Sequence, residues 1–249
     1  MHPSAALLAL APGLALGSFL NVVAARLPRG GSLMRPGSAC VACRAPIAWY
    51  DNIPVVSYLV LGGRCRACDA RIPLRYPVVE VATALLVAAC VLTFGLTPDA
   101  LFAACFCAVL VAVSAIDLEH RIIPNAIVLP AAALVLVANT LLHPGLEWLL
   151  AALGCSAFLF LAVLAYPVGM GMGDVKLALL LGAALGRAGP VALMLGMLAA
   201  LVPVAFLFAR HGKAARKMAI PFGPFLAIGG VVALFFGDRL LDLYLDTWS

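Results

Sequence analysis

Charged residues are scarce in this chain. Only 11% of its 249 residues are Asp, Glu, Lys or Arg, whereas 65% are hydrophobic, and the mean hydropathy is +1.13. A soluble domain has about 25% charged residues and about 45–50% apolar residues. The composition therefore excludes an ordinary soluble domain and indicates an integral membrane protein.

Several well-known catalytic and binding motifs are also missing. The chain has no HExxH sequence, which excludes a zincin, and it has no P-loop or dinucleotide-binding fingerprint. It has no G-x-S-x-G elbow and no serine paired with an obvious histidine base. Of the four histidines, His120 and His211 fall in polar turns, where solvated histidines are common. The net charge of +5 fits a membrane orientation signal better than a nucleic-acid surface, so no nucleic-acid partner is expected.

Long apolar runs fill most of the sequence. A helix needs about 20 apolar residues to cross a bilayer, and runs that are continuous rather than alternating favour helices over membrane strands. We therefore expect an all-α polytopic membrane protein with about eight transmembrane helices. The first run lacks a preceding basic region, so we interpret it as a helix rather than as a signal peptide. The expected spans are 5–25, 77–95, 99–117, 122–142, 147–167, 174–187, 190–209 and 219–237.

The basic residues predict the orientation. If the N-terminus lies outside, every one of the 16 lysines and arginines except Arg187 and Arg239 falls in an inner connection or beside one. The positive-inside rule therefore places these connections in the cytoplasm. The inner connections are 26–76, 118–121, 168–173 with the adjoining helix start, and 210–218.

Two aspartates interrupt apolar stretches. Asp117 lies in SAIDLEHRIIPN and Asp174 in GMGMGDVKLALL, and the topology puts both at cytoplasmic helix ends. Ionisable residues at membrane depth usually face the protein interior or a wet cavity and have a function there. The alternative is that each is a helix-end charge facing headgroups, or that Asp174 is a helix cap.

A pair of carboxyl groups suits amide hydrolysis. The ionised one takes a proton from water, and the protonated one polarises the carbonyl and later protonates the leaving amine. Like charges a few ångströms apart do not both ionise cheaply, which favours this division of roles. Glycines at 169, 171 and 173 would let a substrate backbone approach Asp174 closely.

Four cysteines form two C-x-x-C pairs in the polar segment 26–76: Cys40, Cys43, Cys65 and Cys68. This spacing is typical of a four-thiolate zinc site. The pairs are slightly further apart than in a usual zinc ribbon, which an inserted hairpin or turn would explain. Disulfides and a redox dithiol are the alternatives, but the cytoplasm keeps thiols reduced. We expect a small cytoplasmic zinc-binding loop domain after the first helix, with folding energy from the metal.

The remaining cysteines lie inside apolar spans, where we expect small buried hydrophobic side chains. They are Cys90, Cys105, Cys107 and Cys155.

The motif Gly171-Met-Gly-Asp-Val-Lys176 is similar to the GxGD signature of intramembrane aspartyl proteases. The wider pattern resembles the bacterial type IV prepilin peptidases, and it does so in order over nearly the whole chain. The other matching pieces are Gly17-Ser-Phe-Leu-Asn-Val22, Arg26-Leu-Pro28, the two C-x-x-C pairs flanking Trp-Tyr-Asp-Asn-Ile-Pro, Arg75-Tyr-Pro-Val-Val-Glu80, Asp117 with Ile123-Pro124, and Ile220-Pro-Phe-Gly-Pro-Phe225.

The resemblance implies a bifunctional enzyme of the bacterial inner membrane. Such an enzyme cleaves the basic leader of prepilins or pseudopilins at the cytoplasmic face, and then N-methylates the new N-terminal residue with S-adenosylmethionine. Asp117 and Asp174 match the catalytic pair, and the cysteine loop is linked to methylation. One departure is Asn125, where many members carry Asp; it is not an alternative catalytic acid here.

The resemblance also suggests a division into domains. Residues 1–25 form the first transmembrane helix, 26–76 the methylation-linked zinc loop, and 77–249 the transmembrane aspartyl peptidase domain. A basic leader would be oriented by acidic groups, for which Asp51, Glu80 and Glu119 are candidates.

Three other functions remain open on the residues alone. One is a peptidase without methyltransferase activity, against which the cysteine loop argues. Another is a non-enzymatic zinc-binding membrane scaffold, which leaves GMGMGD unexplained. The third is a carrier or channel that relays protons, but this would need acidic residues at the mid-plane of repeated halves, and no such repeat is visible.

Overall fold

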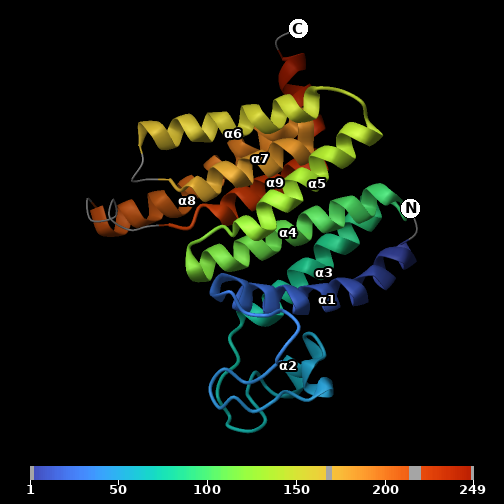
Figure 1. The fold of residues 1–249 in the computed structure, drawn as a ribbon, viewed down its shortest axis with the longest axis vertical. Helices are drawn as coiled ribbons and strands as arrows, with labels where there is room; N and C mark the ends of the chain where they lie inside the picture. Colours follow the sequence, from blue (N-terminus) through green and yellow to red (C-terminus); the bar gives the residue numbers. More distant parts are fainter. Residues whose placement is uncertain (1–2, 167–169, 213–219, 248–249) are drawn as a thin grey trace. The chain divides into compact units, whose positions relative to one another are not determined.

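The computed structural model describes residues 3–166, 170–212 and 220–247, and in these ranges the chain is almost wholly helical (Figure 1). Within the described ranges the only β pairing is two isolated bridges, Ala39 with Pro46 and Arg64 with Arg71. The expected all-α fold is therefore confirmed. The chain forms two compact units, Met1–Ala115 and Ile116–Ser249.

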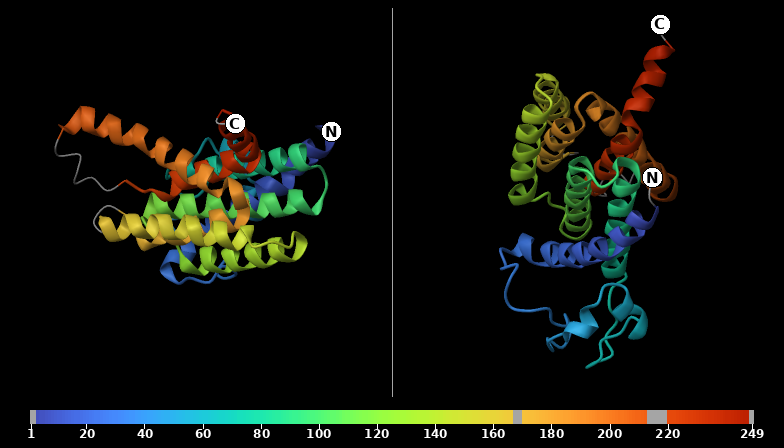
Figure 2. Two further views of the ribbon diagram at one scale, coloured as in Figure 1. Left: turned by 90° about the horizontal axis from the view of Figure 1, so that it is seen from above. Right: turned by 90° about the vertical axis from the view of Figure 1, so that its right-hand side faces the viewer.

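The first unit is built on helices α1 (Pro3–Arg26) and α3 (Arg75–Phe94), which pack along each other (Figures 1 and 2). Gly13 and Gly17 lie one turn apart on α1, and a Cβ at Gly17 would lie 2.6 Å from the Cα of Glu80. Small residues at this spacing let two membrane helices approach closely. One turn further on, the Asn21 amide donates to the carbonyl of Tyr76 at 3.0 Å.

A polar segment joins α1 to α3 in this unit. It contains the short helices η1 (Leu27–Arg29), η2 (Trp49–Asn52) and α2 (Val56–Val60). The insertion between the cysteine pairs contains η2 and α2 together with turns at 54–55 and 61–63, which agrees with the expected turn. Helix α4 (Pro98–His120) follows α3 and begins in the first unit.

The second unit is organised around α7. It contains the end of α4, followed by α5 (Asn125–Leu142), α6 (Glu147–Ala165), α7 (Met172–Leu185), η3 (Gly186–Ala188), α8 (Gly189–His211) and α9 (Gly223–Asp246). Helices α5, α6, α8 and α9 all contact α7, which lies among them in both views (Figures 1 and 2). Leu177, Leu180 and Leu181 of α7 are completely buried. Side chains at the start of α7 are thus held by a rigid core.

Seven described segments are long and apolar enough to cross a membrane. Six of them match expected spans one to one. The seventh, Met172–His211, contains both α7 and α8, which correspond to the expected spans 174–187 and 190–209. With 14 residues, α7 is about 21 Å long at about 1.5 Å per residue, which is shorter than a bilayer core of about 30 Å. The chain is a multi-pass membrane protein, and its sixth expected span is short.

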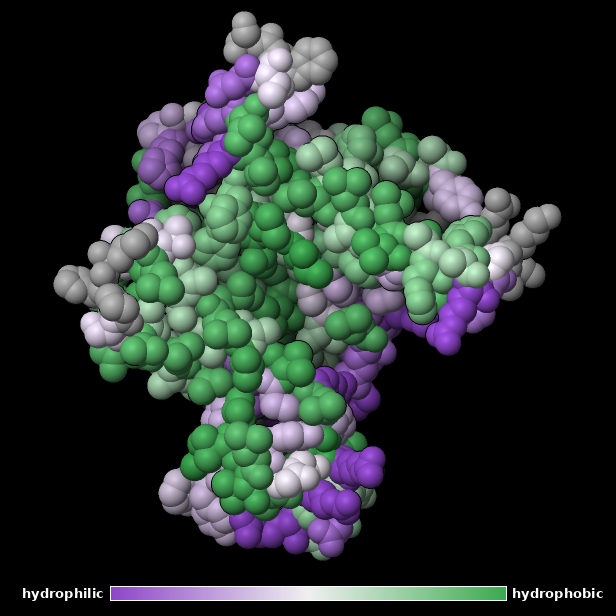
Figure 3. Space-filling view, turned by 180° about the vertical axis from the view of Figure 1, so that it is seen from behind, coloured by the Kyte–Doolittle hydropathy of each residue, from purple (hydrophilic) through white to green (hydrophobic). Residues whose placement is uncertain are grey.

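The surface agrees with this conclusion. Figure 3 shows hydrophobic residues over most of the helices, with hydrophilic residues gathered on the loop after α1 and near the end of α9. Cys90, Cys107 and Cys155 are buried as expected, but the expectation is wrong for Cys105, which is exposed. Its helix α4 presents apolar residues on its outer face as well, including Leu101, because lipid accepts them.

Part of the predicted orientation signal lies outside the described residues. Lys213, Arg216 and Lys217 of the expected inner connection are in this group, as is Gly169 of the glycine-rich turn.

Candidate active site and metal centre

Asp117 lies near the end of α4 and is only 5% exposed. Its Oδ2 atom accepts a hydrogen bond of 2.9 Å from the backbone N–H of Gly223, the first residue of α9. A Cβ at position 223 would lie 2.8 Å from the same oxygen. Only glycine therefore lets the start of α9 come close enough to donate to this carboxyl group.

Asp174 is the third residue of α7 and is 7% exposed. Its Oδ2 atom accepts the backbone N–H of Gly171 at 3.1 Å. A carboxylate in this position satisfies a free donor of the helix N-terminus and is stabilised by the helix dipole. The capping role considered from the sequence therefore describes Asp174 correctly. A cap does not need to be buried beside a second carboxyl group, however, so capping alone does not account for this site.

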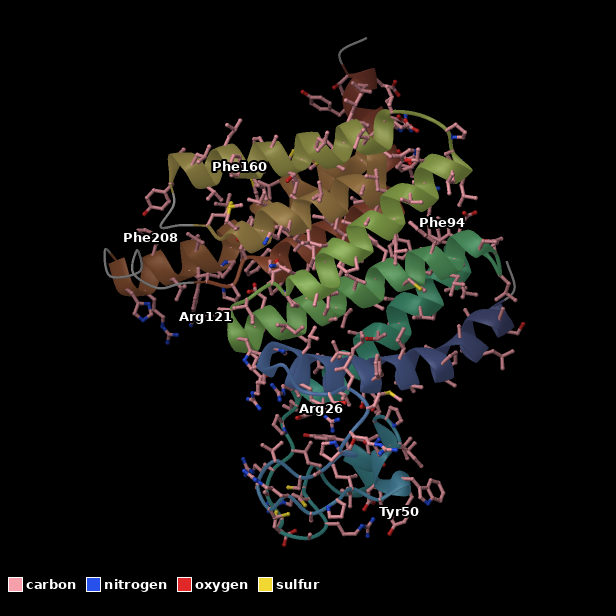
Figure 4. The ribbon with its side chains drawn as sticks, in the orientation of Figure 1. Arg26, Tyr50, Phe94, Arg121, Phe160 and Phe208 are labelled. Carbon is pink, nitrogen blue, oxygen red and sulfur yellow. The ribbon has the colours of Figure 1, made fainter. Side chains whose placement is uncertain are left out.

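The two carboxyl groups come together in the second unit. The charge of Asp117 acts on Asp174, which places them within electrostatic range of each other. The connection after α4 packs against the start of α7, where a Cβ at Gly173 would lie 2.8 Å from the Cβ of Ile123. Two segments 57 positions apart in the sequence are thereby joined at one place, near Arg121, which Figure 4 labels at the end of α4.

Two basic residues border this pair. Arg121 has a left-handed backbone, with φ of 54°, and its charge acts on Asp117. The Lys176 ammonium group donates to the Oδ1 atom of Asn125 at 2.8 Å. Asn125 thus holds a lysine one turn into α7.

The acidic residues suggested for orienting a basic leader have other contacts. Asp51 accepts two hydrogen bonds of 2.7 Å from Arg66, and this guanidinium group lowers the pKa of Asp51 below its usual value. Glu80 is buried and accepts the backbone N–H of Val55 at 2.8 Å. Glu119 lies 3.7 Å from the Nε2 atom of His120. Asp51 and Glu80 therefore have partners within the first unit.

The four predicted cysteine ligands converge within the first unit. The sulfur atoms of Cys40, Cys43, Cys65 and Cys68 all lie within 4.8 Å of one another. The Cys40 and Cys68 sulfur atoms are 3.9 Å apart. A tetrahedral site with metal–sulfur bonds of about 2.3 Å requires sulfur atoms about 3.8 Å apart, whereas a disulfide requires about 2.05 Å. The cluster therefore fits a four-coordinate metal ion, and all four cysteines are free thiols.

The two C-x-x-C pairs have the same backbone structure. The carbonyls of Cys40 and Cys65 accept the N–H groups of Arg44 and Asp69 at 2.9 and 3.0 Å. Arg44 and Asp69 both have a left-handed backbone, with φ of 59° and 56°. The backbone N–H groups of Cys43 and Ala42 lower the pKa of the Cys40 thiol to about 6. The thiolate is the form that binds metal, so this turn favours the ligand state before any ion arrives.

Comparison with known protein families covers both units. Residues 12–94 match the model of the bacterial peptidase A24 N-terminal domain, and residues 103–209 match the model of the type IV leader peptidase family. The chain belongs to the type IV leader peptidase family. No solved structure matches it at a significant level.

Curated relatives of this leader peptidase family member align over almost their whole length. A Pseudomonas aeruginosa protein named prepilin leader peptidase/N-methyltransferase is 38% identical, with 98% of this chain and 95% of the relative covered. Proteins of the same name from Bacillus subtilis and Legionella pneumophila are 34% and 32% identical. The alignment covers 94% of this chain in both cases, and 95% and 92% of the relatives respectively.

Sequence reasoning missed two backbone groups at the aspartate pair. The N–H groups of Gly171 and Gly223 hold the aspartates, although both glycines belong to motifs shared with the family. The sequence feature that could have identified Gly223 is its position directly before Pro224. Proline is common in the first turn of a helix, so this pattern marks a helix start whose free N–H groups need an acceptor.

Proposed function

We propose that this protein is a prepilin leader peptidase that also N-methylates the new N-terminus of its product. The observation that carries the proposal is the pair of buried carboxyl groups, Asp117 and Asp174, brought within electrostatic range by segments distant in the sequence. The curated names of the relatives support both activities, because the similarity extends over the whole chain.

Asp117 and Asp174 act as an aspartyl dyad. One carboxylate removes a proton from a water molecule, which attacks the scissile carbonyl carbon. The other, protonated, donates a hydrogen bond to the carbonyl oxygen and then gives its proton to the leaving amine, so the two carboxyl groups have exchanged protonation states at the end of the reaction. One oxygen of each group accepts a backbone N–H, which restricts the orientation of both carboxyl groups before substrate binds, and restricted orientation lowers the barrier.

The substrate is a prepilin or pseudopilin with a basic leader and an apolar helix. The enzyme lies in the bacterial inner membrane, in contact with lipid, with its aspartates and its cysteine loop on the cytoplasmic side. The distribution of the basic residues supports this orientation. A scissile bond between leader and helix then lies at the level of the dyad. Nucleic acid has no role in this reaction.

Methylation uses S-adenosylmethionine as the methyl donor. The nitrogen of the new N-terminal residue attacks the methyl carbon, the carbon–sulfur bond breaks with its electron pair going to sulfur, and the amine loses a proton. We assign this activity to the loop domain 26–76 and the cleavage to 77–249. Cys40, Cys43, Cys65 and Cys68 hold a zinc ion that fixes the loop, because a closed site of four thiolates is structural rather than catalytic.

Replacing either aspartate by asparagine should abolish leader cleavage. An amide can neither accept the proton of water nor share one with its partner. The Asp117→Asn and Asp174→Asn variants should therefore lose at least about a thousandfold in cleavage rate, measured by mass spectrometry of a co-expressed prepilin. The double variant should be about as inactive as either single one, because residues that act as a unit are non-additive.

Asp99→Asn is the matched control for the dyad, since Asp99 is an exposed acid in the first turn of α4. It should cleave at the wild-type rate. Near-normal cleavage by a well-folded Asp117→Asn or Asp174→Asn protein would contradict the dyad.

Gly223→Ala should reduce cleavage without removing any charged group. The added methyl group would lie 2.8 Å from the Oδ2 atom of Asp117, so the carboxyl group must shift. A displacement of about 1 Å can cost about a hundredfold in rate, and we expect a loss between tenfold and about a hundredfold. Gly154→Ala is the control, because a Cβ there would meet nothing within 4 Å. Equal rates for the two alanine variants would show that the contact with Gly223 does not position Asp117.

Purified protein should contain about one zinc ion per chain, as a single four-thiolate site requires. Elemental analysis should show this content falling in Cys40→Ser and staying constant in Cys105→Ser, a control outside the cluster. A metal-free wild-type protein with a disulfide within the cluster in cells would rule out the zinc site.

Cys43→Ser should impair methylation more than cleavage, because the metal fixes the loop and the aspartates belong to a separate compact unit. The ratio of methylated to unmethylated cleaved product, read from the same mass spectra, should fall at least about tenfold. Unchanged methylation in a metal-free variant would exclude the loop from this activity.

A further inference from the structure

The first unit contains a partly open cavity of about 690 Å³. Its walls come from the last turns of α1, the first turns of α3 and the polar segment between them, and every lining residue lies between positions 18 and 80. Figure 4 labels Arg26 where α1 enters this segment and Tyr50 within it, and both residues line the cavity. Pockets for small molecules usually measure about 300–1,000 Å³, so this cavity has the size of a ligand site.

One wall of the cavity carries a buried carboxyl group with neutral partners. Glu80 is 8% exposed, and its described partners are the backbone N–H of Val55 and the hydroxyl group of Ser18. Four arginines also line the cavity: Arg26, Arg66, Arg71 and Arg75. Arg26 is bound to the carbonyls of Ser32 and Gly37, Arg66 to Asp51, and Arg75 to the hydroxyl group of Tyr76 at 3.2 Å. Arg71 is exposed, and none of the four is a described partner of Glu80. A buried carboxylate is costly unless a cation accompanies it.

The backbone at Val55 is strained at the same place. Its φ is +61°, which is unusual for a β-branched residue. The bond to Glu80 holds it in this conformation. Strain of this kind is found preferentially where a ligand is bound.

Aromatic rings complete the wall. Tyr50, Tyr58 and Tyr76 line the cavity, and the Arg75 guanidinium lies 4.9 Å from the ring centre of Tyr76. Flat rings bind planar heterocycles, and tyrosine rings also attract cations. The lining thus combines a negative charge with stacking surfaces.

We propose that this cavity binds S-adenosylmethionine, with Glu80 supplying the negative charge that its sulfonium and ammonium groups require and the tyrosines flanking its adenine. The inference rests on the proposed methyltransferase function and gives it a site. The cavity also explains why the metal matters for methylation. Cys40 and Cys65 line it as well, so the metal fixes part of the wall against which the methyl donor lies.

Binding of radiolabelled S-adenosylmethionine to the purified full-length protein tests this site. Glu80→Gln keeps the size of the side chain and an acceptor for Val55, and it should weaken binding about tenfold or more. The same variant should weaken the binding of S-adenosylhomocysteine less than that of S-adenosylmethionine, because S-adenosylhomocysteine lacks the sulfonium charge. Ala25→Phe places a ring at a lining position and should weaken both ligands.

The matched controls are Asp99→Asn, an acid elsewhere in the unit, and Ala11→Phe, an exposed position of the same helix α1. Both should bind like the wild type. Zinc content and elution as a single species report whether each variant is folded. Wild-type affinity for S-adenosylmethionine in folded Glu80→Gln and Ala25→Phe proteins would overturn the inference.

Photo-crosslinking provides a second measurement that needs no variant. Ultraviolet irradiation with methyl-labelled S-adenosylmethionine should label peptides between residues 18 and 80. Label confined to the second unit, in a protein that still methylates prepilin, would overturn the cavity and leave the proposed function intact. A wild-type protein that cleaves prepilin but neither binds S-adenosylmethionine nor methylates would refute both the site and the methyltransferase half of the proposed function.

Discussion

The structure depends on how a membrane protein with few charged residues provides hydrogen-bond partners for the charged groups that it buries. In lipid, an unpaired polar group costs several kcal/mol, so each must find a partner inside the protein. Asp117 and Asp174 find theirs in the free N–H groups at the starts of α9 and α7. These donors are available only at helix ends, which therefore determine where in the bundle a carboxyl group can lie.

Glycine makes these close contacts between helix ends and functional groups possible. At Gly223 and Gly173 any side chain would collide with Asp117 or Ile123, and on α1 Gly17 allows the contact with α3. Gly223 positions a proposed catalytic group, and Gly17 brings the cavity walls together. The same residue type thus serves the carboxyl pair in one unit and the cavity in the other, in both cases by letting backbone approach a functional group.

Much of this architecture could be predicted from local sequence. The length of the apolar runs predicts the helices, and the boundaries of those runs put Asp117 and Asp174 near helix ends. Cysteine spacing predicts a cluster whose geometry fits a metal. The pairing of Asp117 with Gly223 could not be predicted, because the residues are 106 positions apart and no local pattern specifies which helix start meets which helix end. Hydropathy also cannot tell that Cys105 faces outward.

The surroundings of Glu80 could not be predicted from sequence alone. Near a run of arginines it resembled either an anchor for a basic leader or the partner of an arginine. In the structure it binds the strained backbone of Val55 and the hydroxyl group of Ser18, and it lies on a cavity wall. Arg66, a cation on the same cavity wall, is paired with Asp51 instead. A buried carboxyl group whose described partners are neutral leaves its charge to be balanced by something that enters the cavity, and a positively charged methyl donor meets that requirement.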